Sequence, residues 1–328
     1  ITTEKVTLTD DLKTLLQSRA IFNYAVDYRS KNNEIKPASQ FEFSDSEFKK
    51  FQSFLKTDLS FKTKQEKLFQ KAYESVDKNQ NKKINNDYLK VLNTLKKEKI
   101  ASLLTPIATS CCKQINVLFK TSSTNSYLLE RLDKEDIHGQ VVLAEYQSGG
   151  RGRRGNQWVS PLANGLYISL AWRFDVVPGA LGLLSLFAGV AVARTLTGLG
   201  LSGISLKWPN DIVVGEKKIG GILLDLRGEA AGPVHVIIGI GINYDLPQQA
   251  KEDIDQANID ICSLTEQRFS RNEIVAGLLS HIFEILNGIE TNKSLALVNE
   301  WRSYDCYVGR KAKLLLPNKE ITGILKGV

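Results

Sequence analysis

The run at residues 150–155 reads Gly-Arg-Gly-Arg-Arg-Gly and has the composition of a loop that binds an anionic ligand. It places three guanidinium groups among three glycines, shortly after the apolar segment 141–144. Glycine lets the backbone approach a ligand closely, and arginine supplies a permanent charge and a planar donor fork that suits carboxylate and phosphate. The run therefore predicts a site for a phosphate-bearing ligand, with a flexible basic surface loop as the alternative.

The same run satisfies the dinucleotide-binding pattern G-x-G-x-x-G. That pattern requires a following helix, whose N-terminus holds the pyrophosphate. Here the next residues, 156–161, are Asn-Gln-Trp-Val-Ser-Pro, and their polar character and proline argue against an immediate helix. We therefore do not expect a Rossmann site.

Four further clusters of polar residues and glycines lie at the ends of apolar segments, at residues 123–125, 207–211, 217–221 and 239–243. Each has an ordinary explanation by itself. A Ser-Thr-Asn triplet caps a helix, and Pro-Asn-Asp forms a turn. Lysine before Gly-Gly ends a hairpin, and Gly-x-Gly allows tight packing. Together and in this order, with the arginine loop between the first two, they resemble the motifs of the biotin protein ligase family.

The resemblance to biotin protein ligases extends from about residue 103 to the C-terminus and rests on four strings. These are Ser-Thr-Asn-Ser-Tyr-Leu-Leu at 123–129, Glu-Tyr-Gln through the arginine loop at 145–155, Lys-Trp-Pro-Asn-Asp at 207–211 and Lys-Ile-Gly-Gly-Ile-Leu at 218–223. The resemblance implies an α+β fold of the class II aminoacyl-tRNA synthetase and biotin ligase type, in which helices flank a mixed β-sheet.

The resemblance also implies a two-step reaction. Biotin is first activated by ATP, with Mg²⁺, as biotinyl-5'-AMP, and it is then transferred to a lysine of the biotin carboxyl carrier protein of acetyl-CoA carboxylase. The positions that match biotin-binding residues of the family are Ser123, Thr124, Asn125, Gln147, Arg151, Gly152, Arg153 and Lys218.

Two of these positions, Lys218 and Arg153, match catalytic residues of the family. Forming the adenylate brings a carboxylate against a polyphosphate, so fixed cations must offset the repulsion. The positions that match nucleotide-binding residues are Arg153, Trp158, Asn210, Asp211 and Asn243. Asp211 is the expected metal ligand, since Mg²⁺ takes oxygen ligands.

Two other functions stay open. One is a lipoate-type acyl ligase, which has the same fold but lacks the arginine string, so the string favours biotin. The other is a ligase core that binds biotin but has impaired transfer and no enzymatic role. The resemblance further implies a cytoplasmic enzyme without membrane association, and a homodimer is a further expectation. The four cysteines have no metal-ligand spacing, which predicts free thiols in a reducing compartment.

Apolar segments predict a mixed sheet with helices packed against it. Strands are expected at 115–119, 141–144, 166–172, 204–208, 211–214, 222–226 and 234–240. Helices are expected at 126–132, at 180–196, and after the capping pair Ser270 and Glu273. The uncharged stretch 176–193 is long enough to raise the question of a membrane span. Its proline and glycines favour a buried helix instead.

The first hundred residues differ in character from the rest. They contain no glycine and carry 20 Lys and Arg against 14 Asp and Glu. Capping pairs at Ser44 and Glu47, and at Thr63 and Glu66, predict helices there. The segment resembles more distantly the C-terminal tail of C-terminal-processing serine proteases, through Ala-Ile-Phe-Asn-Tyr-Ala at 20–25. Its basic balance is weak evidence for nucleic acid, because a solvated lysine-rich helix gives the same count and no clear winged helix is visible.

We therefore expect three parts. Residues 1–100 form a helical segment of separate origin, and residues 101–304 form the catalytic domain. Residues 305–328, with strands at 307–315 and 320–325, form the start of a truncated SH3-like β domain. The chain begins with Ile1 and contains no methionine, so we expect it to be part of a longer translation product.

Overall fold

The chain divides into two units, Ile1–Thr94 and Leu95–Val328, and the second contains the candidate site. The computed structural model describes residues 94–176, 178–228, 233–289, 294–316 and 319–327. The helices expected before residue 94 lie outside these residues. Leu95 and Ile100 are completely buried in the second unit. The second unit therefore begins a few residues before the expected boundary at residue 100.

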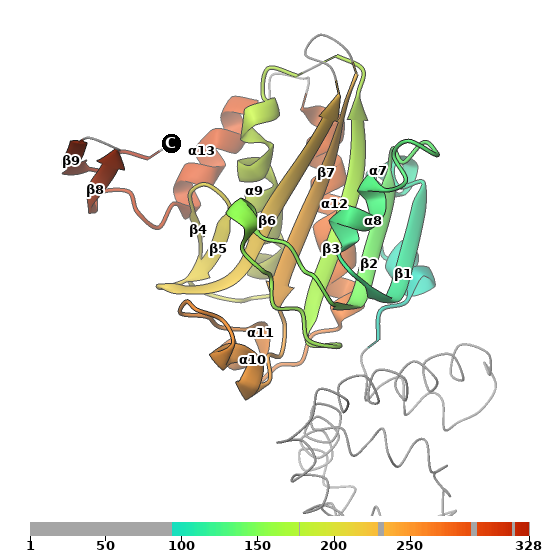
Figure 1. The fold of residues 1–328 in the computed structure, drawn as a ribbon, viewed down its shortest axis with the longest axis horizontal. Coiled ribbons are helices and arrows are strands. Elements are labelled where there is room, and N and C mark those ends of the chain that lie inside the picture. Colours follow the sequence, from blue (N-terminus) through green and yellow to red (C-terminus); the bar gives the residue numbers. More distant parts are fainter. Residues whose placement is uncertain (1–93, 177, 229–232, 290–293, 317–318, 328) are drawn as a thin grey trace, which may run out of the picture. The chain divides into compact units, whose positions relative to one another are not determined.

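The second unit is built on a seven-stranded sheet with the order β1-β2-β3-β7-β6-β5-β4 (Figure 1). Its strands are β1 Gln114–Thr121, β2 Gln140–Gln147, β3 Gly165–Phe174, β4 Ile204–Lys207, β5 Asp211–Val214, β6 Lys217–Gly228 and β7 Val234–Asn243. β1 and β2 are parallel, whereas the other neighbours are antiparallel. The predicted mixed sheet is confirmed. β6 is much longer than expected, because it begins at the polar lysines.

The two faces of the sheet are covered by different helices, as the alternation of side chains along a strand requires. One face packs against α9, Leu184–Gly198, and α12, Arg271–Gly288, and their apolar side chains form the main core with residues such as Leu143 and Ile238. The opposite face carries α8, Thr124–Leu129, over a smaller cluster that includes Leu128, Val142 and Ile237 (Figure 1).

The helix α9 is apolar on nearly all sides, which is typical of a helix in the centre of a core. By length and composition, Leu181–Gly198 is the one stretch among the described residues that could cross a membrane, but 61% of it is buried in this fold. The expected buried helix is thus confirmed. It begins at Leu184, after a 3-10 turn at Leu181–Leu183.

The remaining helices come before the first strand of the sheet or after its last strand in the sequence. They are α6 Lys97–Ser102, α7 Pro106–Cys111, α10 Gln248–Glu252, α11 Ile261–Leu264 and α13 Ser294–Tyr304. The capping pair expected at the start of α12 does not form. Ser270 is the N-cap residue there, but its side chain makes no capping hydrogen bond.

A buried ion pair ties the N-terminal end of the second unit to the sheet. Glu145 on β2 and Arg271 on α12 are both completely buried, and Arg271 Nη2 lies 2.6 Å from Glu145 Oε2. The other oxygen of Glu145 accepts from the backbone N–H of Leu95 at 2.8 Å, and Arg271 also donates to the carbonyl of Gly165 at 3.1 Å. These bonds satisfy both charged groups, which is the condition for burying them.

The C-terminal residues form a two-stranded hairpin, β8 Lys311–Leu316 and β9 Lys319–Ile324. The two expected strands are present, although the first begins four residues later than its expected start at residue 307. A two-stranded ribbon does not by itself define an SH3-like barrel.

Candidate functional site

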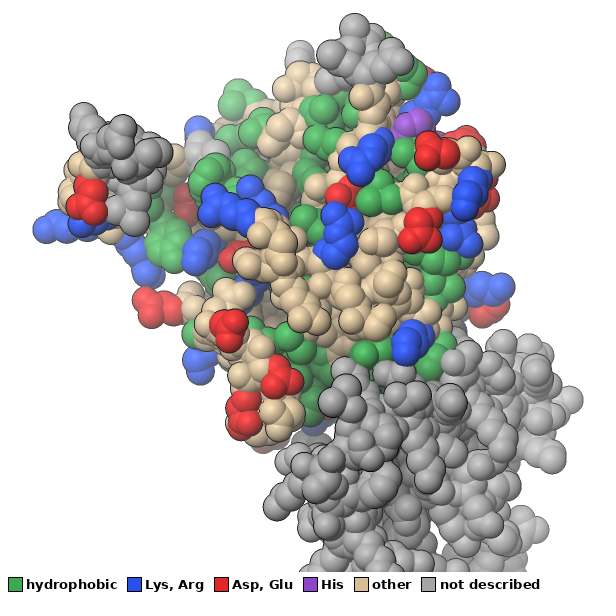
Figure 2. Space-filling view, in the orientation of Figure 1, with side chains coloured by type: hydrophobic (Ala, Val, Ile, Leu, Met, Phe, Trp, Pro, Cys, Tyr) green, Lys and Arg blue, Asp and Glu red, His purple; other side chains and the backbone are tan. Residues whose placement is uncertain are grey.

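A cavity of about 340 Å³ opens on the face of the sheet that carries α8. Its floor consists largely of backbone, because Gly221 on β6 lies opposite Gly241 on β7, and Gly239 lies two residues before Gly241 on the same face of β7. Figure 2 shows Lys and Arg side chains gathered over the middle of this face. The predicted site residues that line the cavity are Ser123, Thr124, Asn125, Gln147, Arg151, Gly152, Arg153, Trp158, Asn210, Asp211 and Lys218.

The polar end of the cavity is a chain of buried hydrogen bonds between α8 and the sheet. Gln147 Oε1 accepts from the backbone N–H and the hydroxyl of Thr124, at 2.9 and 3.2 Å, while its Nε2 donates to Ser160 Oγ at 2.9 Å. Ser169 Oγ lies 2.7 Å from Thr124 Oγ1 and also contacts Asn125. Ser123 is the N-cap of α8. Each of these groups is held by a neighbour, so the polar end is rigid before any ligand binds.

Two glycines make room for the side chains that shape the cavity. A Cβ at Gly239 would lie 2.2 Å from Asn125 Oδ1, and a Cβ at Gly241 would lie 2.4 Å from the indole of Trp158. Real Cβ atoms do not tolerate such distances, so glycine is required at both positions for Asn125 and Trp158 to lie where they do. The Gly-x-Gly pattern of the sequence thus has a steric cause.

The arginine loop follows β2 and contributes one wall of the cavity. Its only regular element is a 3-10 turn at Arg153–Gly155, and extended backbone follows from Asn156. The α-helix that a dinucleotide site needs is therefore missing at this place, as expected from the sequence. Arg154 has a φ of 57°, a left-handed value that is uncommon outside glycine, and its side chain is exposed.

Two of the arginines are held by side chains of the sheet. Arg151 makes a two-pronged ion pair with Asp225 on β6, at 3.1 and 3.0 Å, and Arg153 donates to Asn210 Oδ1 at 3.1 Å. Asp225 also accepts from Asn125 Nδ2 at 2.8 Å. Asp225 was not predicted as a site residue, because its signal in the sequence is slight: a single carboxylate in the apolar run Leu223–Leu226.

A lysine, Lys218 near the start of β6, adds to the positive charge of the arginines that line the cavity. Its Nζ lies 2.7 Å from Asp211 Oδ1 on β5, with the two side chains 17% and 18% exposed, and 5.6 Å from the ring centroid of Trp158. The register between β5 and β6 shifts at this point, which indicates a β-bulge. Bulges of this kind redirect side chains near functional sites. Within the described residues, Trp158 Nε1 is buried and has no hydrogen-bond partner.

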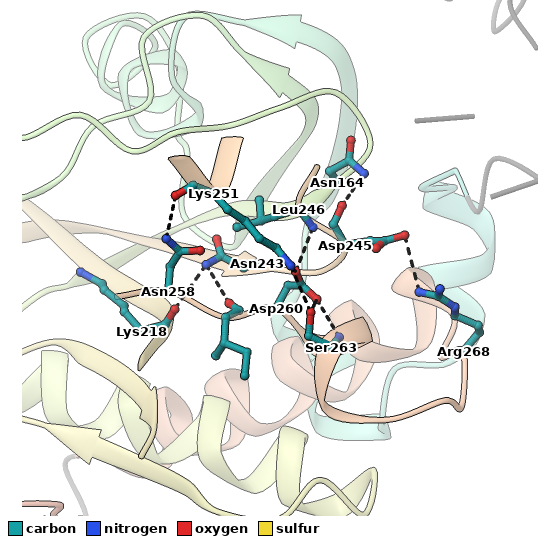
Figure 3. A network of polar contacts seen from close by, with 11 residues as sticks. Asn164, Lys218, Asn243, Asp245, Leu246, Lys251, Asn258, Asp260, Ser263 and Arg268 are labelled. Atoms are coloured by element: carbon teal, nitrogen blue, oxygen red, sulfur yellow. Dashed lines mark hydrogen bonds and ion pairs between the residues drawn. The ribbon is translucent and has the colours of Figure 1, made fainter. Parts of the chain in front are cut away.

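Asn243 was expected near the nucleotide, but it does not line the cavity. It is buried, and its Nδ2 donates to the carbonyls of Ile259 and Lys218, at 3.0 and 3.4 Å. Figure 3 shows the Lys218 carbonyl turned toward Asn243 and the Lys218 ammonium pointing away. The structure therefore places Asn243 as a support for the backbone of Lys218.

A buried carboxylate, that of Asp260, holds the neighbouring segment that also supports the backbone of Lys218. Asp260 accepts from the backbone N–H of Ser263 at 2.7 Å and from that of Leu246 at 3.3 Å, and it pairs with Lys251 Nζ at 2.7 Å (Figure 3). The backbone N–H of Ile259, next to Asp260, donates to the Lys218 carbonyl at 3.0 Å. The polar network thus fixes the strand that presents Lys218.

Comparisons with known proteins agree with this geometry. The family described as "Biotin/lipoate A/B protein ligase family" matches residues 118–243. A biotin--[acetyl-CoA-carboxylase] ligase of Mycobacterium tuberculosis is 33% identical over 223 residues, which cover 66% of this chain and 80% of that protein. The chain belongs to the biotin protein ligase family.

Other members of the biotin protein ligase family give the same result. The bifunctional ligase/repressor BirA of Escherichia coli is 35% identical over 216 residues, which are 65% of this chain and 66% of that protein. The biotin protein ligase of Aquifex aeolicus in complex with biotin and ATP superimposes with a TM-score of 0.54 at 29% identity, covering 66% of this chain and 88% of that one. The chain thus spans about two thirds of the E. coli protein.

The N-terminal part of this chain is similar to a different family. Residues 12–107 match the family described as "Probable PDZ-protease, C-terminal helical domain". This agrees with the resemblance to a processing-protease tail drawn from the sequence.

The cavity offers few side chains that could hold a metal ion. Among the residues that the structure describes, no group of three His, Cys, Asp or Glu side chains comes together. Asp211 is the carboxylate at the predicted place, and it is paired with Lys218. A single protein carboxylate fits Mg²⁺, which proteins often bind through one carboxylate while substrate phosphates supply most of the other ligands.

The titratable groups outside the cavity have ordinary roles. All four cysteines are free, as expected. Burial raises the pKa of the Cys112 and Cys262 thiols to about 11, so these thiols stay neutral near pH 7. Within the cavity lining, burial also raises the pKa of Tyr167, whose hydroxyl donates to the carbonyl of Pro161 at 2.8 Å.

Several residues that line or support the site were not predicted from the sequence, among them Asp225, Ser160, Ser169 and Trp208. Ser160 and Ser169 complete the hydrogen bonds of Gln147 and Thr124. Trp208 lines the cavity although 59% of its surface is exposed, which is unusual for so large an apolar side chain. Trp208 belongs to the Lys-Trp-Pro-Asn-Asp string, and this motif could have marked it as a site residue.

Proposed function

We propose that this protein is an ATP-dependent biotin protein ligase, which activates biotin as biotinyl-5'-AMP and transfers it to a lysine of a carrier protein. One observation carries the proposal. A single cavity joins a rigid, neutral hydrogen-bonding end at Thr124 and Gln147 to a cationic end at Arg153 and Lys218. Biotin has a matching division, with a neutral ureido ring at one end and a carboxylate at the other.

The neutral end suits the ureido ring because it offers both donors and acceptors. The ring has two N–H donors and one carbonyl acceptor. Hydroxyls such as those of Ser123 and Thr124 can donate or accept, and the Gln147 amide can do both. Asn125, Arg151 and Gly152 line the adjacent wall of the cavity. Because the groups at this end are already hydrogen-bonded to one another, binding costs little ordering.

The cationic end suits the activation step. A biotin carboxylate oxygen attacks the α-phosphorus of ATP and forms the mixed anhydride, and pyrophosphate leaves with the electrons of the broken P–O bond. Negative charge accumulates around the phosphorus, and fixed cations that face it lower the barrier. We assign this role to Lys218 and Arg153, which both line the cavity. Asn210 holds Arg153 in position through its Oδ1.

Trp158 and Asp211 suit the nucleotide side of the same end. The buried Trp158 Nε1 is an unused donor at the cavity wall, which a phosphate oxygen can accept from. Mg²⁺ held by the ATP phosphates and Asp211 would neutralise part of the phosphate charge when bound. Asn243 contributes to nucleotide binding only through Lys218, whose backbone it supports.

In the transfer step, the neutral amine of the carrier lysine attacks the carbonyl carbon of the adenylate. An amide bond forms, AMP leaves with the electrons of the C–O bond, and the amine loses a proton. We propose the biotin carboxyl carrier protein of acetyl-CoA carboxylase as the acceptor, since the M. tuberculosis relative is named for that enzyme. A cytoplasmic location is consistent with four free thiols.

Transfer of labelled biotin tests the proposal. The full chain is incubated with labelled biotin, ATP, Mg²⁺ and a biotin carboxyl carrier domain, and the carrier is then analysed by mass spectrometry. We expect one biotinyl group on one lysine, and none when ATP is omitted or when that lysine is replaced by arginine. Labelling that does not need ATP, or no labelling in the complete mixture, would contradict the proposal.

A further inference from the structure

Ser169 on β3 is a completely buried polar residue at the polar end of the cavity. Its Oγ lies 2.7 Å from Thr124 Oγ1 and also contacts Asn125 Oδ1. Thr124 and Asn125 line the cavity, whereas Ser169 does not. Ser169 can therefore affect a ligand only through these two neighbours. Because a hydroxyl has one hydrogen to donate, the direction of its hydrogen bonds decides what the neighbours present to the ligand.

The orientation of the Asn125 amide fixes the direction of the Ser169 hydroxyl. Asn125 Nδ2 donates to Asp225 Oδ2 at 2.8 Å and to the backbone carbonyl of Leu223 at 3.3 Å. A carboxylate and a carbonyl accept hydrogen bonds, so the NH₂ group of Asn125 must face them and its Oδ1 must face Ser169. Since Oδ1 can only accept, the hydrogen of Ser169 goes to Asn125, and Ser169 has none left for Thr124.

The Gln147 amide is fixed in the same way on the other side of Thr124. The backbone N–H of Thr124 can only donate, so the atom that faces it at 2.9 Å must be Gln147 Oε1. Gln147 Nε2 then donates to Ser160 Oγ at 2.9 Å, and Ser160 donates its own hydrogen to the carbonyl of Trp158 at 3.1 Å. The oxygen that Gln147 turns toward Thr124 is therefore an acceptor.

The Thr124 hydroxyl thus lies between two acceptors, Ser169 Oγ at 2.7 Å and Gln147 Oε1 at 3.2 Å. The shorter contact has the usual length of an O–H···O bond and needs the hydrogen of Thr124, because that of Ser169 is already used. Whichever acceptor takes it, the hydrogen of Thr124 stays within the protein. The Thr124 oxygen can then offer a ligand only a lone pair.

We propose that Ser169 is a positioning residue that determines specificity: it holds the Thr124 hydroxyl in the direction in which its oxygen accepts from a ligand, so that this end of the cavity selects a group that donates an N–H. In naming the ligand this inference rests on the proposed function, because the ureido ring of biotin has two N–H donors. The dithiolane ring of lipoate has none. The direction of the hydrogen bonds is a property of the unliganded chain, and it can be tested without any ligand.

A double-mutant cycle in urea tests the hydrogen bonds in the unliganded full chain. Tryptophan fluorescence follows the second unit, since all four tryptophans lie in it. Ser169→Ala leaves the Thr124 hydroxyl without its nearer acceptor, whereas Thr124→Val removes that hydroxyl and keeps the shape of the side chain. Ser169→Ala should therefore lower the urea midpoint by less in the Thr124→Val background than in the wild type.

Ser280→Ala is the matched control for this cycle. Ser280 is a buried serine on α12, which covers the opposite face of the sheet, and its Oγ accepts from the backbone N–H of Thr105 at 3.2 Å. Its replacement should lower the urea midpoint by the same amount with and without Thr124→Val, because the two sites share no partner. Equal shifts for Ser169→Ala in both backgrounds would overturn the assigned direction of the Thr124 hydroxyl.

The selectivity of the site is measured by equilibrium dialysis with biotin and with two analogues in which a ring oxygen replaces one or the other ureido N–H. This replacement keeps the shape of the ring and turns a donor into an acceptor. The wild type should bind at least one analogue about tenfold or more weakly than biotin, since two acceptors then face each other. In Ser169→Ala the Thr124 hydroxyl can turn toward the ligand, so this preference should shrink several-fold. Ser280→Ala should keep it.

The possible outcomes separate this inference from the proposed function. An equal preference in Ser169→Ala and the wild type, or a wild type that binds both analogues as tightly as biotin, would overturn the role of Ser169 in selection. If the wild type binds neither biotin nor an analogue, the proposed function fails, and selection of an N–H donor fails with it. The urea cycle then still decides whether Ser169 directs the Thr124 hydroxyl.

Discussion

Lys218 Nζ lies 2.7 Å from Asp211 Oδ1, and this pair spans the two strands that meet at the cationic end of the cavity. The β-bulge between β5 and β6 lies at the same place, with Val213 paired to Lys218 and Ile212 paired to Gly220. Each partner neutralises the other in the unliganded chain. A phosphate that enters the cavity therefore finds a cation that is already fixed in place, which is the condition for efficient electrostatic stabilisation.

Replacement of Lys218 by alanine should slow adenylation strongly. Loss of one fixed charge at a developing anion costs about 2–4 kcal/mol in the barrier. The rate of adenylate formation, followed in a single turnover, should fall at least about thirtyfold in Lys218→Ala, with the fold intact by circular dichroism. Lys217→Ala is the matched control, because Lys217 is the exposed neighbour on the same strand. Equal rates in both variants would remove Lys218 from the mechanism.

Replacement of Gly239 by alanine should damage the polar end of the cavity. The new Cβ would lie 2.2 Å from Asn125 Oδ1, so Asn125 must leave its position. Overpacking of this kind costs about 1–3 kcal/mol, which a urea titration can measure. Biotin affinity should fall as well. Gly182→Ala is the control, since no atom lies within 4 Å of its added Cβ. A Gly239→Ala chain with wild-type stability and affinity would contradict the steric account.

Two truncated chains should behave differently. Removal of residues 1–93 should leave biotin binding intact, because the second unit begins at Leu95. Removal of residues 1–102 also deletes the buried Leu95 and Ile100 and the N–H that Leu95 donates to Glu145. The longer deletion should lower the melting temperature clearly, since each buried aliphatic side chain contributes about 2–5 kcal/mol. Loss of biotin binding in the shorter deletion would show that the N-terminal segment takes part in the site.

The stability of the chain should fall above pH 9 partly because of Cys262. Burial, followed by the charge of Asp245, raises the pKa of this thiol to about 11. Below pH 9 the thiol is neutral in the folded and unfolded chain, and its contribution is complete. Between pH 9 and 11 the unfolded thiol ionises first, so folding stability declines as pH rises, by about 1 kcal/mol at pH 10. Denaturant titrations of Cys262→Ala should show a smaller decline from pH 8 to 10, and an identical decline would refute the assignment.

Much of the sheet could be predicted from the sequence, because its strands are short apolar runs rich in Val and Ile between glycine-containing turns. The core segments of β3, β5 and β7 agree with the expected ranges. The motif residues of the cavity were also found, since the polar clusters lie at strand ends where the topology brings them together. The short helices α10 and α11 carry too little periodicity to be recognised.

The contacts that organise the site could not be predicted. Asp225 pairs with Arg151 across 74 positions of the sequence, and nothing local marks a carboxylate in an apolar strand as the partner of a loop arginine. The β-bulge at Lys218 depends on strand register, which a single strand does not specify. Asn243 matched a nucleotide-binding position, yet its amide supports the backbone of Lys218, because the loop before α11 folds back against β6.

The central claim is that this cavity activates biotin with ATP, and pyrophosphate exchange tests it most directly. The full chain is incubated with Mg²⁺, ATP and labelled pyrophosphate, and incorporation of label into ATP is measured without an acid, with biotin and with lipoate. We expect exchange that depends on biotin, little with lipoate, and a loss in Lys218→Ala but not in Lys217→Ala. Equal exchange with lipoate, or no exchange with either acid in the folded chain, would contradict the account.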